Sequence, residues 1–159
     1  MIVVSDTSAI ISLVRINQVN LLPLLFGKVI IPTAVKSELT NARFTDAERK
    51  TIESADWLFV KSITSEIDFI NDLDDGEREA ISLAKELHAD FLVIDEAPGR
   101  QEAKRLGLRT IGVLGILVLA KERGIIAMVK PQIDSLIQKS EFWVSEKLIT
   151  HILKQANEL

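Results

Sequence analysis

The sequence predicts a single α/β domain in which helices cover both faces of a central parallel sheet, and three observations support this fold class. Short apolar runs alternate with segments of helical spacing along most of the chain. The runs are apolar throughout rather than alternating with polar residues, which is typical of strands buried on both faces of a parallel sheet. A length of 159 residues suits one domain with a sizeable core.

Five apolar runs are expected to be strands because they are short, mostly β-branched and bounded by turn residues. They are residues 2–4, 29–31, 58–60, 91–94 and 110–111. The segments with helical spacing lie between them, at residues 8–16, 33–39, 46–53, 76–87 and 98–106. The apolar run 111–120 predicts a buried strand followed by a helix and is too short to span a bilayer. Residues 62–75 are expected to form a surface loop or short helix.

After Gly124 the pattern becomes purely helical. Residues 129–139 and 145–157 are both amphipathic, and the second carries one apolar stripe made of Leu148, Ile149, Ile152 and Leu153. We interpret 125–159 as a C-terminal helical extension of a core over about 1–124, within one domain. The stripe fits packing on the domain's own core as well as contact with a second copy or a partner.

Composition excludes several classes of protein. The absence of cysteine rules out disulfides, thiolate metal sites and cysteine nucleophiles, and it suits a reducing cytosol. No basic region precedes an apolar stretch at the amino terminus, so we expect a cytoplasmic protein without a signal peptide or membrane contact. The net charge of −4 argues against a general binder of duplex nucleic acid. An enzyme that meets RNA at a metal site stays compatible, because bound divalent ions reverse the local charge.

Acidic residues follow the predicted strands at the places where sites form in parallel α/β sheets, beyond the carboxyl ends of the strands. Asp6 comes one serine after the first strand, and Asp95 follows the run 91–94 directly. Glu38 lies on the helix after the second strand, and Glu77 lies in the first turn of the helix that Leu73-Asp74-Asp75-Gly76 opens. We expect these four carboxylates to converge on one end of the sheet.

Four carboxylates held close together repel one another, and a hard divalent cation relieves that repulsion. Oxygen ligands favour Mg²⁺ or Mn²⁺, and no histidine lies near these positions to support zinc. Such ions activate water for phosphodiester hydrolysis. Each acid taken alone also has a simpler interpretation: Asp6 as a helix cap, Glu38 as a solvated residue, and Glu77 as a first-turn acid favoured by the helix dipole. It is the set of four, one for each βα unit, that favours a site.

Four stretches in this order resemble the PIN-domain family, closest to a prokaryotic subgroup of predicted nucleic-acid-binding PIN proteins related to VapC-type toxins. The stretches are Ser5-Asp6-Thr7-Ser8-Ala9-Ile10-Ile11, residues 30–39 with Glu38, residues 73–84 with Glu77, and residues 89–96 with Asp95 followed by Gly99-Arg100. The resemblance covers most of the chain. It implies a PIN-like three-layer fold and a Mg²⁺- or Mn²⁺-dependent ribonuclease acting on RNA, with frequent homodimers and, for toxins, a small antitoxin partner.

By the same resemblance, Asp6, Glu38, Glu77 and Asp95 are metal ligands or orient the attacking water. Thr7 or Ser8 would then hydrogen-bond Asp6, and Arg100 is a candidate contact for an RNA phosphate or a solvated helix residue. Toxin relatives more often have aspartate at the third position, so Glu79 or Asp75 could replace Glu77, and Glu96 could contribute beside Asp95.

Other functions fit less well or differ in class. A haloacid-dehalogenase phosphatase needs a second aspartate at the position of Ser8. The phosphate-binding Gly-Lys-Ser/Thr loop of a P-loop enzyme is missing. The acidic pair and the late lysine of a response-regulator receiver domain are not evident. The serious rival is a non-catalytic PIN-like module that binds RNA or a protein. A toxin held inactive by a basic antitoxin tail across the acidic cleft is a further possibility that the net charge suits.

Overall fold

A five-stranded, all-parallel sheet forms the centre of the molecule in the computed structural model, which describes residues 1–159. The strands are β1 (Val3–Ser5), β2 (Val29–Ile31), β3 (Leu58–Val60), β4 (Phe91–Val93) and β5 (Thr110–Ile111). Their order across the sheet is β3-β2-β1-β4-β5. The chain therefore extends the sheet from β1 through β2 to β3 and then returns to β1's other edge with β4. The predicted fold class and all five predicted strands are confirmed.

Nine helices surround the sheet. They are α1 (Thr7–Arg15), α2 (Leu21–Phe26), α3 (Thr33–Leu39), α4 (Asp46–Glu53), α5 (Asp75–Glu86), α6 (Ala97–Arg105), α7 (Val113–Glu122), α8 (Lys130–Lys139) and α9 (Glu146–Gln155). Helix α2 is the one element that the sequence pattern did not predict. It has no side-chain cap and its six residues include Pro23, so its helical conformation depends on burial of Leu21, Leu22, Leu25 and Phe26 in the core.

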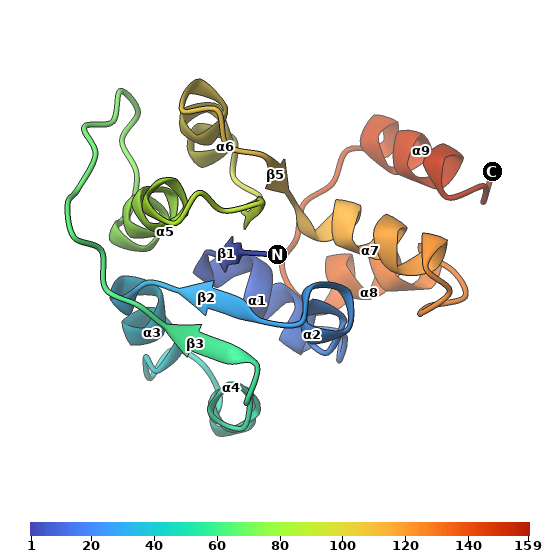
Figure 1. Cartoon of the computed structure of the whole chain (residues 1–159). Helices are drawn as coiled ribbons and strands as arrows, with labels where there is room; N and C mark the ends of the chain where they lie inside the picture. Colours follow the sequence, from blue (N-terminus) through green and yellow to red (C-terminus); the bar gives the residue numbers. More distant parts are fainter.

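The two faces of the sheet are covered by different helices, giving three layers (Figure 1). The larger core contains residues of α1, α2, α7, α8 and α9, together with strand residues such as Val3 and Val93. The smaller core joins α5 and α6 to the opposite face through Val4, Leu92 and Ile94. Consecutive strand residues alternate between these cores, which explains why the strands are apolar throughout.

The C-terminal helices pack on the domain itself. Ile133 and Leu136 of α8, with Ile152 and Leu153 of α9, belong to the same core cluster as α1. Leu148, at the edge of the predicted α9 stripe, is 42% exposed. The buried part of the stripe therefore serves the domain's own core, while Leu148 faces a groove described below. No helix of the chain is both long and apolar enough to cross a bilayer.

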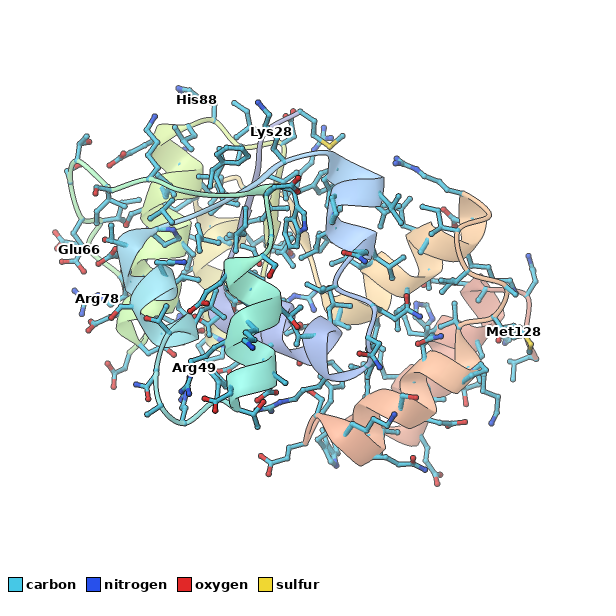
Figure 2. The ribbon with its side chains drawn as sticks, turned by 90° about the horizontal axis from the view of Figure 1, so that it is seen from below. Lys28, Arg49, Glu66, Arg78, His88 and Met128 are labelled. Atoms are coloured by element: carbon cyan, nitrogen blue, oxygen red, sulfur yellow. The ribbon has the colours of Figure 1, made fainter.

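The long connection between β3 and α5 is held by helix side chains rather than by secondary structure of its own. Glu102 of α6 accepts from the backbone N–H groups of Ile70 and Asn71, and its exposed fraction is 1%. Glu86 accepts from Thr64 and Ser65. Glu66 forms an ion pair of 2.7 Å with Arg78, visible at the left of Figure 2. These contacts fix the connection that leads into the first turn of α5, which contains the acidic residues Asp75 and Glu77.

Candidate active site at the carboxyl edge of the sheet

The aspartates Asp6 and Asp95 lie beyond the carboxyl ends of two adjacent strands, β1 and β4. Strand β1 is followed by a crossover to β2 on one side, whereas β4 lies on its other side. The backbone N–H of Asp6 donates to the carbonyl of Val93 at 3.1 Å, which continues the ladder up to the acids. The pair thus flanks the point at which the strand order reverses, where open α/β sheets bind ligands.

Asp6 is 3% exposed and caps α1, because its Oδ1 accepts from the backbone N–H of Ala9 at 3.2 Å. Ser8 Oγ donates to Oδ2 at 3.3 Å. Burial raises the pKa of Asp6 well above its usual value against the effect of the Ala9 hydrogen bond, and the carboxylates of Asp95 and Glu77 raise it further. Asp6 therefore both caps α1 and belongs to the acidic site.

Asp95 is held at the start of α7. Its two carboxylate oxygens accept from the backbone N–H of Val113, at 3.1 and 3.3 Å. A Cβ at residue 112 would collide with Oδ1 of Asp95, so glycine at 112 makes this approach possible. Burial raises the pKa of Asp95 to about 6, while the hydrogen bond from Val113 and the charge of Arg100 act in the opposite direction.

Glu38 projects from α3 and is oriented through both of its carboxylate oxygens. Thr7 Oγ1 donates to Oε2, and the backbone N–H of Gly76 donates to Oε1 at 3.1 Å. The first turns of α1 and α5 therefore fix the carboxylate of a residue on a third helix. Thr7 and Ser8 were the two predicted alternatives for the partner of Asp6; Ser8 bonds Asp6 as predicted, whereas Thr7 bonds Glu38.

Glu77 forms a reciprocal capping box with Asp74 at the start of α5. Oδ1 of Asp74 accepts from the N–H of Glu77 at 2.8 Å, and Oε1 of Glu77 accepts from the N–H of Asp74 at 3.4 Å. The second oxygen, Oε2 of Glu77, is buried and has no hydrogen-bond partner. Burial raises the pKa of Glu77 to about 7, with the Asp74 carboxylate as the next contribution. An orphaned buried carboxylate oxygen is costly unless something binds it.

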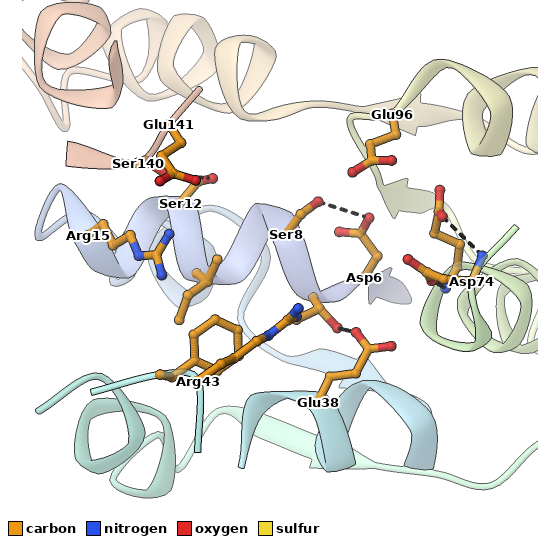
Figure 3. A pocket seen from close by; sticks show the side chains of 14 residues that line it. Asp6, Ser8, Ser12, Arg15, Glu38, Arg43, Asp74, Glu96, Ser140 and Glu141 are labelled. Atoms are coloured by element: carbon orange, nitrogen blue, oxygen red, sulfur yellow. Dashed lines mark hydrogen bonds between the residues drawn. The ribbon is translucent and has the colours of Figure 1, made fainter. Parts of the chain in front are cut away.

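These side chains surround an open cavity of about 390 Å³, which we call the acidic pocket (Figure 3). Its lining residues are Asp6, Thr7, Ser8, Ile11, Ser12, Arg15, Glu38, Arg43, Phe44, Asp74, Glu77, Glu96, Ser140 and Glu141. Three of the four predicted acids line it together, and Asp95 lines an adjoining cavity that shares Glu96 with it. The acids of the predicted set are thus gathered at one edge of the sheet.

Two arginines also line the acidic pocket (Figure 3). The guanidinium groups of Arg15 and Arg43 lie 5.8 and 4.8 Å from the centroid of the buried Phe44 ring. Arg15 is paired with Glu48 at 2.8 Å, whereas Arg43 has no ion-pair partner. Glu141 lies toward the same end. The pocket therefore offers at least one free cation near its acids.

The remaining predicted residues take different places. Glu79 accepts from Thr33 and from the backbone N–H of Ala34, so it caps α3. Asp75 is exposed in the first turn of α5 and does not line the acidic pocket, while Glu96 lines it. Sequence reasoning missed Asp74, Arg15 and Arg43. The Asp-x-x-Glu spacing of Asp74 and Glu77 is a capping-box signature that could have identified Asp74; the arginines carry no local signal.

The acidic side chains fit a hard divalent cation by their chemistry. All have oxygen ligand atoms, one of them has an orphaned buried oxygen, and burial together with repulsion from Asp95 and Glu77 raises the pKa of Asp6. As they stand, no three of them are close enough to coordinate one ion together. The residues therefore supply the right ligand type, and a bound ion would require side-chain adjustment.

Fold and site together define a parallel α/β domain with acidic side chains at the carboxyl edge of its sheet, the edge at which such folds bind ligands. The family model for DUF3368, described as a PIN domain, matches residues 2–158. The chain therefore belongs to this PIN-domain family, whose fold is generally that of nucleases.

Among solved structures, the chain is similar to a PilT N-terminus domain protein, SSO1118, from the hyperthermophilic archaeon Sulfolobus solfataricus P2. The TM-score is 0.58 with 22% sequence identity, over 77% of this chain and 95% of the other. At this identity the likeness supports the fold alone. No curated protein matches the sequence.

Proposed function

We propose that this protein is a metal-dependent endoribonuclease that hydrolyses RNA phosphodiester bonds at the acidic pocket. The proposed ligands of Mg²⁺ or Mn²⁺ are Asp6, Glu38, Glu77 and Asp95. The observation that carries the proposal is the buried Oε2 of Glu77, which has no hydrogen-bond partner and stands in the same pocket as the buried Asp6. A folded protein keeps an unsatisfied carboxylate beside another only at a cost, which cation binding offsets.

The chain's own residues supply the rest of the chemistry. A bound Mg²⁺ or Mn²⁺ contributes a Lewis acid that makes water nucleophilic near neutral pH and offsets charge on the leaving oxygen. Glu38, with both oxygens oriented by Thr7 and Gly76, is suited to hold the ion or orient the attacking water. Ser8 supports the rotamer of Asp6. Arg43 donates to a non-bridging phosphate oxygen, since its guanidinium lies free on Phe44.

The partners follow from the same pocket. An acidic pocket on a chain of net charge −4 attracts a basic protein segment, so the proposal includes a small antitoxin as inhibitor and a toxin role for the enzyme. It also includes a homodimer, which sedimentation of the purified protein would test. The simplest observation in support of the toxin role is a small open reading frame beside the gene that encodes a protein with a basic tail.

A non-catalytic PIN-like module that binds RNA or protein is the second candidate. The observation that favours it is that no three acids stand ready to coordinate one ion. Under this alternative the acids would serve only capping and orientation, as Asp6 and Glu77 also do.

The experiment that separates the two is cleavage of a mixed structured-RNA pool with Mn²⁺, beside an EDTA blank. Asp6→Asn is the test variant, because an asparagine oxygen can still accept from Ala9 and preserve the helix cap. Asp56→Asn, in an exposed turn before β3, is the matched control. Cleavage by wild type and Asp56→Asn alone supports the nuclease. No cleavage by either, with no Mn²⁺ binding in calorimetry, supports the binding module.

A further inference from the structure

The short connection between α8 and α9 carries an indole that the core does not use. Phe142 and Val144 are partly buried against the main core, whereas Trp143 between them is 85% exposed. The side chains therefore alternate, with the largest one directed to solvent. Exposing a tryptophan forgoes a large gain from burial and leaves a flat apolar face available to a ligand.

Trp143 lines the second cavity, of about 660 Å³, which we call the Trp143 groove. The groove also contains Asp95 of the proposed active site, Arg100 of α6 and the polar side chains His151 and Gln155 of α9. It shares five lining residues with the acidic pocket, namely Ser8, Ser12, Glu96, Ser140 and Glu141. The groove is thus continuous with the acidic pocket and leads from it to the indole.

The lining indicates what fits. Six of the 18 lining residues are hydrophobic, so an apolar helix would leave most of the wall without partners. Glu96 and Glu141 repel a phosphate, so an uncharged group fits beside them and a phosphate fits only beside the cation of the groove. Arg100 is the cation of the groove, and it lies close enough to Asp95 to affect its ionisation. A nucleobase has a flat face for an indole and polar edges for His151 and Gln155.

We propose that the Trp143 groove binds an unpaired base of a single-stranded RNA, stacked on the indole of Trp143, with the adjacent phosphate at Arg100. This inference rests on the proposed ribonuclease function and assigns the residues that hold the base and the phosphate next to the cleaved bond. A base inside a duplex is stacked and paired, so entering the groove would carry the free-energy cost of unstacking and unpairing it. Stacking is tolerant of sequence, so the groove selects for strandedness more than for base identity.

The chain offers a direct optical test, since it has two tryptophans and no tyrosine. Trp57→Phe leaves Trp143 as the only tryptophan, and adding Asp6→Asn keeps the RNA uncut. Titration of this double variant with a single-stranded eight-nucleotide RNA is expected to quench Trp143 emission to saturation. The same sequence in a duplex is expected to have little effect. In the Asp6→Asn background, Trp143→Ala is expected to weaken binding, measured with a labelled RNA, by about 5- to 150-fold. Trp143→Phe is expected to retain most of it.

The outcomes separate this inference from the nuclease proposal. If wild type cleaves RNA and Trp143→Ala binds RNA with unchanged affinity, the proposed role of the Trp143 groove is wrong and the nuclease proposal is retained. If RNA quenches Trp143 emission and Trp143→Ala binds RNA more weakly, but wild type does not cleave RNA, the groove proposal is supported and the nuclease proposal is wrong. A third outcome also contradicts the inference. In it, Trp143 emission shifts with protein concentration in the absence of RNA, and Trp143→Ala converts a dimer to a monomer. Trp143 would then form a contact between two copies of the chain. Circular dichroism verifies that each variant is folded.

Discussion

The backbone N–H of Gly76 donates to Oε1 of Glu38 at 3.1 Å, and a Cβ atom at residue 76 would lie 2.6 Å from that same oxygen. Any side chain at 76 would therefore displace the Glu38 carboxylate. A Cβ at Gly112 would likewise collide with Oδ1 of Asp95, and a Cβ at Gly99 would lie 2.9 Å from Oε2 of Glu77. Three of the four proposed ligands thus lie against a glycine, which allows the backbone to approach their oxygens closely.

Gly76→Ala is predicted to lower RNA cleavage by about 10- to 100-fold, because a displacement of Glu38 of about 1 Å is enough to misplace an active-site group. The helix itself tolerates alanine at this position, so the fold should persist. The measurement is kcat/KM with Mn²⁺, beside Asp75→Ala as a control at the next residue, which faces solvent. Equal activity of Gly76→Ala and Asp75→Ala would show that the position of Glu38 is not important for cleavage.

Much of the fold follows from local signals in the sequence. The five strands are apolar runs bounded by turn residues, and Asp6 and Asp95 follow two of them, so their meeting at one edge is a consequence of a parallel sheet. Helix α2 was missed because its six residues have no cap and are stabilised by burial alone. No local pattern distinguishes it from a loop.

The site was less predictable than the sheet, because contacts between distant residues decide it. Thr7 was one of the two expected partners of Asp6, but the position of α3 places Glu38 within its reach, 31 residues away. Glu79 was an alternative ligand on the same helix as Glu77, and the helix directs it to the start of α3 instead. Arg43 and Arg15 both pack on Phe44, a contact that no local sequence pattern indicates.

The ionisation of Asp95 is predicted to destabilise the metal-free protein. Burial raises its pKa from 3.8 to about 6, so the folded state binds the proton more tightly than the unfolded state does. The stability of wild type relative to Asp95→Asn should then fall as pH rises from about 4 to 6 and level off above that range. The limiting difference is on the order of 3 kcal/mol, at about 1.4 kcal/mol for each pKa unit.

Urea denaturation in EDTA at several pH values measures this difference. Using the difference between two proteins cancels the opposite contributions of Glu48, Glu86, Glu102 and Glu158, whose pKa values are lowered in the folded state. A stability difference that does not change between pH 4 and 7 would contradict the assignment of a raised pKa to Asp95.

Arg43→Gln is predicted to raise KM for RNA by about tenfold with a small change in kcat, because an unpaired guanidinium on Phe44 binds a phosphate away from the cleaved bond. The slope of log KM against the logarithm of the salt concentration should decrease by about one, because one phosphate contact is lost. Arg49→Gln is the control, since Arg49 is already paired with Asp46 on α4. If both variants have the same KM, the pocket arginine does not contact RNA.

The two ends of strand β4 offer the most direct test of the central claim, that the chemistry resides at the carboxyl edge of the sheet. Asp95 follows the strand, and Asp90 precedes it and accepts from the N–H of Ile2 at 2.6 Å, a bond that asparagine can retain. Cleavage of single-stranded RNA with Mn²⁺ should be compared between Asp95→Asn and Asp90→Asn. The account predicts a loss on the order of 100-fold or more for Asp95→Asn and nearly wild-type activity for Asp90→Asn. Equal activity of the two variants would contradict it.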